Sequence, residues 1–141
     1  MKNQYLIIAE NITYKYNKLS CINIYDQFIT FSTPAESFFD LAVMCGPGWE
    51  TGEYDLKINV QIDNEEPVEL GSVKTNIPHD NFVYNAIAPN LKIILPKDAK
   101  TVTFYVYKNN ELVLSRTYPV TELLVQQHEE AVSTEESVKS E

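Results

Sequence analysis

Positive charge is the scarcest property of this sequence. Only 11 of its 141 residues are lysine or arginine, against 20 aspartates and glutamates, and the net charge is -9. The single arginine, Arg116, leaves almost no guanidinium for bidentate contacts to phosphates or guanine edges. A surface of this charge repels phosphate backbones and anionic membranes. We therefore expect neither nucleic acid nor membrane as a partner.

Side chains that hold metals and loops that hold phosphates are also few. The two cysteines are too few for a zinc site unless the two histidines, His79 and His128, contribute. In a reducing compartment Cys21 and Cys45 should be free thiols, and a disulfide is the less favoured alternative. Three of the four glycines fall within residues 46–52, where no helix follows that could bind a phosphate. We predict no metal and no cofactor.

Long hydrophobic runs are missing as well. The apolar stretch nearest the N-terminus covers only residues 5–9 before Glu10 interrupts it, which is too short for the core of an export signal. Nothing approaches the roughly 18 apolar residues that span a bilayer. We therefore expect a cytoplasmic protein.

What the sequence does have is alternation of apolar and polar residues. In residues 53–63 every second side chain is apolar, which gives a strand one face for a core and one for water. Residues 63–67 then form a turn, and 68–73 return as a shorter strand in which Gly71 marks a bulge.

A second hairpin follows the same logic. Residues 101–108 alternate, Asn109 and Asn110 suit the positive φ angles of a two-residue turn, and 111–118 return until Pro119 ends the strand. Further strands are predicted at 5–12, 19–25, 28–31, 38–45, 82–88 and 91–95, the last two joined at Pro89 and Asn90. About nine short strands at regular spacing predict an all-β fold, an antiparallel two-sheet β-sandwich of immunoglobulin-like or C2-like type over residues 1–122.

The C-terminal segment, residues 123–141, differs from the rest. Beyond Gln126 it has five glutamates, one lysine and no aromatic residue. It cannot bury enough apolar surface to offset the loss of chain entropy. We expect an acidic, largely disordered tail, and residues 121–132 can form a turn or two of helix at its start.

Several apolar segments carry a family resemblance. They are residues 6–10, 18–26, 90–93 and 102–107 with its return strand. Over about residues 5–120 this order resembles a family of small bacterial domains of unknown function with immunoglobulin-like or C2-like sandwiches. The resemblance implies the fold and no activity, because fold does not fix function. The loop 46–53 and the acidic tail lie outside the pattern.

Three groups invite a chemical interpretation, and each has a simpler one. His79 could act as a base for Cys45 or a serine with Asp80 as its orienting group, but neighbouring side chains in extended backbone point to opposite faces, which favours an exposed turn. Residues 63–66 are acids and an amide that could bind calcium, but contiguous residues of one turn do not converge on a point. We expect Arg116 to pair with an acid.

Aromatic residues supply the candidate binding sites. Trp49, the only tryptophan, lies in a glycine-rich loop near Glu50 and Glu53, and tryptophan dominates many interfaces. The favoured alternative is that Trp49 plugs the open end of the sandwich. Tyr105 and Tyr107 lie opposite the apolar face of their strand, so they form either an exposed stripe or part of a second packed layer.

No set of residues forms a coherent catalytic centre, and we do not expect an enzyme. The leading hypothesis is a non-catalytic intracellular protein-interaction or assembly module that binds another protein. One alternative is an acidic inhibitor that mimics nucleic acid and binds a basic protein. Another is a carbohydrate-binding module, since sandwiches with aromatic platforms suit sugars, although the expected lack of export argues against it.

Overall fold

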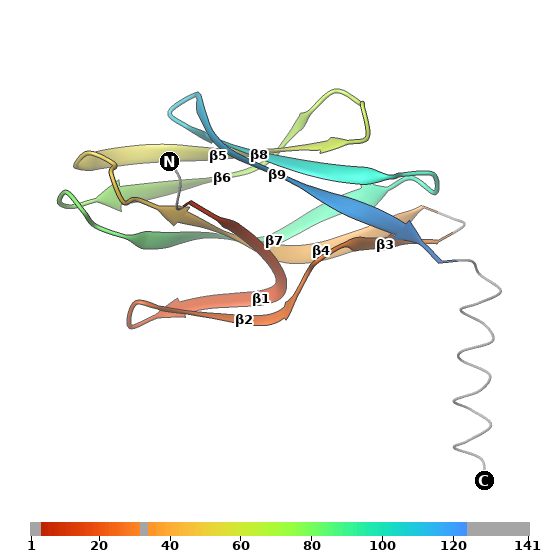
Figure 1. Cartoon of the computed structure of the whole chain (residues 1–141), viewed down its shortest axis with the longest axis horizontal. Helices are drawn as coiled ribbons and strands as arrows, with labels where there is room; N and C mark the ends of the chain where they lie inside the picture. The colour runs from red at the N-terminus through yellow and green to blue at the C-terminus, as the bar shows by residue number, and fades with distance from the viewer. Residues whose placement is uncertain (1–3, 32–33, 124–141) are drawn as a thin grey trace, which may run out of the picture.

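In the computed structural model, the part of the chain that is described forms nine β-strands in two sheets that pack face to face (Figure 1). The structure describes residues 4–31 and 34–123, so most of the predicted acidic tail lies outside the described residues. The strands are β1 (Leu6–Lys15), β2 (Lys18–Ile24), β3 (Phe28–Thr30), β4 (Ala35–Cys45), β5 (Gly52–Ile62), β6 (Val68–Ile77), β7 (Tyr84–Leu95), β8 (Thr101–Lys108) and β9 (Glu111–Glu122). Within these two ranges no helix could cross a membrane.

The order of the strands confirms the predicted sandwich. One sheet has the order β2-β1-β4-β7 and the other β3-β9-β8-β5-β6. Neighbouring strands are antiparallel, except that the short strand β3 runs parallel to β9. The alternation seen in the sequence places Leu56, Ile58 and Val60 of β5 on the inner face.

Four aromatic rings fill the middle of the core. Phe28, Phe39, Phe104 and Tyr118 come from β3, β4, β8 and β9, and their ring centroids lie 5.6 to 6.0 Å apart in five contacts. Most of these contacts are edge-on or tilted, the arrangements that aromatic quadrupoles favour. The cluster therefore ties strands of both sheets together.

Two predicted strand ends are wrong. Residues 82–95 were expected to break at Pro89 and Asn90, but β7 continues through them, and the β4–β7 register shifts there because Asn90 adopts a φ of +56°. Pro119 does not end β9. The Val120 N–H donates to the Lys100 carbonyl, just before β8. Because N–H groups alternate in direction along a strand, an N–H at position 119 would face the opposite edge of β9, towards β3. Pairing with β3 begins only at Val120, so the N–H that Pro119 lacks is not needed there.

A buried carboxylate holds an irregular region in place. Asp40 is 7% exposed, and its two oxygens accept the backbone N–H groups of Ile12 and Asn90, each at 2.9 Å. Near this point β1 bends, and its second half runs with β2 beneath β7 (Figure 1). There Ile12 packs in one apolar cluster with Ala42 and Ile87. Asp40 thus joins the bend of β1 to the irregularity of β7.

Replacing Asp40 by alanine should lower the free energy of unfolding by about 2 kcal/mol or more, because the buried Ile12 N–H and the partly buried Asn90 N–H lose their acceptor. Asp40→Asn keeps one acceptor oxygen, so its free energy of unfolding should lie between those of the native chain and Asp40→Ala. Asp55→Ala, at an exposed strand position, should cost less than about 0.5 kcal/mol. Urea unfolding of the three variants measures this. An Asp40→Ala variant as stable as the native chain would contradict the role of the carboxylate.

Candidate functional site

Trp49 lies inside the molecule. It is 3% exposed and packs in a second core cluster with Cys45, Leu56, Ile77 and Ala86. The loop that carries it passes close to the chain at Phe82: a Cβ at Gly46 would lie 2.1 Å from the Phe82 carbonyl oxygen, and Gly46 has a φ of +74°, so only glycine fits. The structure therefore shows Trp49 as a plug at one end of the sandwich.

The indole ring has defined neighbours but an incomplete set of hydrogen bonds. Tyr54 packs edge-on at 5.3 Å, and the Lys108 ammonium lies 4.6 Å from the centre of the Trp49 ring. The Tyr54 hydroxyl donates to the Glu50 carbonyl at 2.7 Å, which fixes the loop to β5. The buried indole N–H of Trp49 finds no acceptor among the described residues.

A small pocket opens beside this ring. We call it the loop pocket; it has a volume of about 220 Å³ and is lined by Gly48, Trp49, Glu50, Asp80 and Asn81. Asp80 is tied to the same loop, because one of its carboxylate oxygens accepts the Thr51 hydroxyl at 3.4 Å. The sequence predicted Trp49 and Glu50 at one site but assigned Asp80 only to His79, because no local pattern links residues 46–52 with the turn that carries Asp80.

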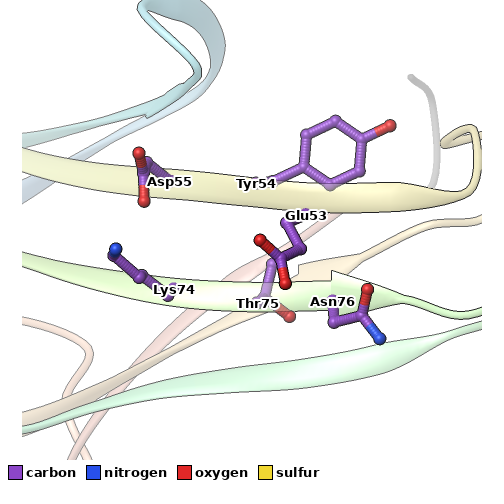
Figure 2. A pocket seen from close by; sticks show the side chains of 6 residues that line it. All are labelled: Glu53, Tyr54, Asp55, Lys74, Thr75 and Asn76. Carbon is purple, nitrogen blue, oxygen red and sulfur yellow. The ribbon is translucent and has the colours of Figure 1, made fainter.

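Glu53 belongs to a different surface. It lies on the outer face of β5, in a hollow of about 340 Å³ that the β5–β6 hairpin forms with Tyr54, Asp55, Lys74, Thr75 and Asn76. Figure 2 shows the Glu53 carboxylate beside Thr75 and Asn76, with the Lys74 side chain towards Asp55. Strand alternation turns Glu53 away from Trp49, so the predicted trio does not form one site.

Tyr105 and Tyr107 lie on the outer face of the five-stranded sheet. Their neighbours Phe104 and Val106 point into the core, and both tyrosines are half-buried. The Tyr105 hydroxyl donates to the Gln61 side-chain oxygen at 2.7 Å. Because the four-stranded sheet packs on the opposite, inner face, the tyrosines form the stripe that was one of the two interpretations.

The acidic turn after β5 has a structural task. One Asp63 oxygen accepts the backbone N–H groups of Lys100 and Thr101 at 2.7 and 3.0 Å, which joins this turn to the start of β8. A pocket of about 310 Å³ there is lined by Val60, Ile62, Asp63, Glu65, Glu66, Val68, Pro96, Asp98 and Ala99. Across residues 4–31 and 34–123, no group of three or more His, Cys, Asp or Glu side chains could hold a metal ion.

The groups considered for nucleophilic chemistry do not meet. Cys45 is fully buried, its S–H donates to the Val43 carbonyl at 3.7 Å, and burial raises the pKa of the thiol to about 11 against smaller opposing effects of hydrogen bonding. The exposed His79 ring contacts the Asp80 carbonyl oxygen at 2.8 Å, not the carboxylate that would orient a base.

Arg116 was expected to pair with an acid, but its partners among residues 4–31 and 34–123 are of another kind. Its guanidinium donates to the Leu6 carbonyl at 2.6 Å and lies 4.6 Å from the centre of the Tyr118 ring. Alternation along β9 turns this side chain to the inner face, where a backbone carbonyl of β1 and an aromatic ring are its neighbours.

Comparison with models of known protein families and with curated protein sequences finds no match to this chain. The family resemblance of its apolar segments therefore stays a prediction.

The stability of the fold should fall as the pH rises from 9 towards 11 because of Cys45. The unfolded chain ionises this thiol near pH 9, whereas the folded chain holds it neutral to about pH 11, so the unfolded state binds fewer protons in that window. Two pKa units correspond to roughly 2 to 3 kcal/mol. Because pH 10.5 lies below the folded pKa, most but not all of this is lost there, and the stability advantage of the native chain over Cys45→Ala should shrink by about 2 kcal/mol between pH 8 and pH 10.5, measured by urea unfolding.

The tyrosines also ionise in this pH range, and they are present in both the native chain and Cys45→Ala. Taking the difference in stability between these two proteins therefore cancels the contribution of the tyrosines. Cys21→Ala serves as the control, since Cys21 is only partly buried and should show a smaller change. A constant difference between the native chain and Cys45→Ala across this range would refute the prediction.

Proposed function

We propose that this chain is a non-catalytic protein-binding module whose contact surface is the outer face of the five-stranded sheet. We call the middle of this surface the tyrosine face. Alternation along β5, β8 and β9 gives it eight side chains, namely Lys57, Asn59, Gln61, Thr103, Tyr105, Tyr107, Ser115 and Thr117.

The observation that carries the proposal is the absence of carboxylates among these eight side chains in a chain with 20 acids. Aspartate and glutamate are depleted at the centres of protein interfaces, whereas tyrosine is enriched there. Tyrosine, serine and asparagine are also the residues that dominate antibody combining sites. The carboxylates of the same face lie at its border, with Glu53 and Asp55 earlier on β5 and Glu69 opposite Asn59 on β6, so the middle of the face is the part without negative charge.

Hydrogen bonds within the tyrosine face hold its side chains in place before any partner arrives. Tyr105 is fixed by Gln61, and the hydroxyls of Thr103 and Thr117 lie 2.9 Å apart across β8 and β9. Cross-strand neighbours pack Tyr105 between Asn59 and Ser115. A surface that is already ordered loses less side-chain entropy on binding, which favours affinity.

Two features support a binding role over catalysis. The Cys45 thiol is buried and carries a raised pKa, which is the opposite of an activated nucleophile. Among the described residues His79 is the only histidine, and its ring nitrogen contacts a backbone carbonyl in place of a carboxylate.

Exchange of both tyrosines, Tyr105→Ser with Tyr107→Ser, should abolish capture of the partner. The tagged full chain would be used to recover proteins from its native host, and the bound protein identified and purified. Against that protein the double variant should raise the Kd by about 30-fold or more, the effect of losing one interface hot spot of about 2 kcal/mol. Calorimetry gives the Kd.

Tyr16→Ser provides the matched control. Tyr16 is 82% exposed at the β1–β2 turn, on the other sheet, so its loss should leave the Kd unchanged. Urea unfolding of all variants would show that they remain folded. If the double variant binds every captured protein as the native chain does, the proposal fails. Retention on a glycan array that disappears in the double variant would replace it with carbohydrate binding.

A further inference from the structure

The free edge of strand β2 is a second surface, on the other sheet, and it does not depend on the tyrosine face. We propose that β2 pairs antiparallel with β2 of a second copy of this chain, about a two-fold axis at Ser20. The four-stranded sheets of the two copies would then form one continuous sheet. Three observations lead to this assignment, namely free backbone groups, an unprotected sheet edge and a charge pattern that complements itself.

The backbone groups come first. β2 lies at the lower border of the molecule in Figure 1, and among the described residues it pairs with β1 alone. Both residues of the turn 16–17 have positive φ angles, so the flanking pair of Lys15 and Lys18 exchanges both backbone hydrogen bonds. Hydrogen-bonded and non-hydrogen-bonded pairs alternate along the ladder. The N–H and C=O groups of Leu19 and Cys21 therefore point away from β1, and no described group bonds to them.

The other sheet edges carry the usual protection against pairing, which is proline, a bulge or a very short strand. β7 contains Pro89, β6 has a bulge before Gly71, and β3 has only three residues. β2 has none of these devices between Leu19 and Ile22, and the Ile22 side chain is 58% exposed. The regular edge is short, because Asn23 adopts a φ of +55°. An edge of this kind can accept another strand over a few residues.

The charges of the β1–β2 hairpin favour an antiparallel second copy. Residues 10–26 are neutral in a chain of net charge -9, because their two acids are balanced by two lysines, Lys15 and Lys18. The lysines lie at the turn of the hairpin, whereas Glu10 and Asp26 lie towards its open end. Two-fold pairing of β2 places the positive turn of each copy beside the negative open end of the other. Parallel pairing would place like charges together, which disfavours association.

The register of the pair follows from the free groups. Leu19 of one copy exchanges both hydrogen bonds with Cys21 of the other, and the two-fold axis repeats this pair, so all the free groups are used. The Ser20 side chains of the two copies face each other, and Lys18 lies opposite Ile22. Both are non-hydrogen-bonded pairs, whose Cα atoms lie about 4.5 Å apart. Because the paired segment is short, we expect a weak dimer with a Kd on the order of 0.1 mM.

Disulfide trapping tests the register. Ser20→Cys in a Cys21→Ala background should form a covalent dimer on mild oxidation, because cysteines at the axis lie close enough to bridge. Thr13→Cys in the same background is the matched control. Thr13 is exposed and lies across the hairpin from Ser20, but its two copies would be about 14 Å apart, or three strand spacings. Cys45 is fully buried in both variants. Non-reducing electrophoresis should show at least about 5-fold more dimer for Ser20→Cys.

Two charge variants separate this pairing from general electrostatics. Ile22→Lys places a lysine opposite Lys18 of the second copy, so the dimer Kd should rise about 10-fold, since the axis repeats this unfavourable contact. Ile22→Glu places a carboxylate there, and the Kd should stay within about 3-fold of the native value. General repulsion between acidic chains predicts the reverse order, because Ile22→Lys lowers the net negative charge. Sedimentation velocity of the full chain gives the Kd.

Four results would overturn the assignment. The first is a native chain that stays monomeric at about 1 mM, roughly ten times the expected Kd. The second is equal trapping of Ser20→Cys and Thr13→Cys, which would locate the contact elsewhere. The third is a dimer that Ile22→Glu weakens as much as Ile22→Lys, which would show that Lys18 does not lie opposite. The fourth is loss of the dimer in Tyr105→Ser with Tyr107→Ser, which would assign it to the tyrosine face.

Discussion

The packing of four aromatic rings between the sheets decides which way the strands face. Phe28, Phe39, Phe104 and Tyr118 are almost completely buried and touch one another across both sheets. Because side chains alternate along a strand, fixing Phe104 in the core turns Tyr105 to the opposite face. A slip of one residue would exchange the two faces and expose the rings. The composition of the tyrosine face is therefore set by the same constraint that builds the core.

Short-range sequence patterns predict much of this architecture. The two-residue period of β5 and β8 identified their inner faces, and Asn109 and Asn110 adopt the positive φ angles expected of their turn. The predicted breaks at Pro89 and Pro119 failed because whether a proline ends a strand depends on which neighbour its missing N–H would have faced. That neighbour is a property of the assembled sheet. The role of Asp40 was invisible for the same reason, since its partners lie 28 and 50 residues away.

The candidate sites also divide into features that short-range patterns predict and features that depend on the assembled sheets. Alternation alone placed Tyr105 and Tyr107 opposite the core, and only the question of a covering layer was left for the structure to answer. Proximity in sequence grouped Trp49, Glu50 and Glu53, but β5 begins at Gly52 and its alternation sends Glu53 to the outer face. The carboxylate that lines the loop pocket beside Glu50 belongs instead to Asp80, in the turn between β6 and β7. No short-range sequence pattern connects that turn with residue 49.

Strand β8 connects the tyrosine face with the loop pocket physically. Tyr107 lies on the tyrosine face, and the next residue, Lys108, extends over the rings of Trp49 and Tyr54. A cation held over an aromatic face restrains the orientation of that ring, and the orientation of the indole determines where its N–H can donate. The paired strands β5 and β9 on either side make β8 one of the least mobile positions available in this fold. The geometry of the loop pocket therefore rests on the same rigid element that presents the tyrosines.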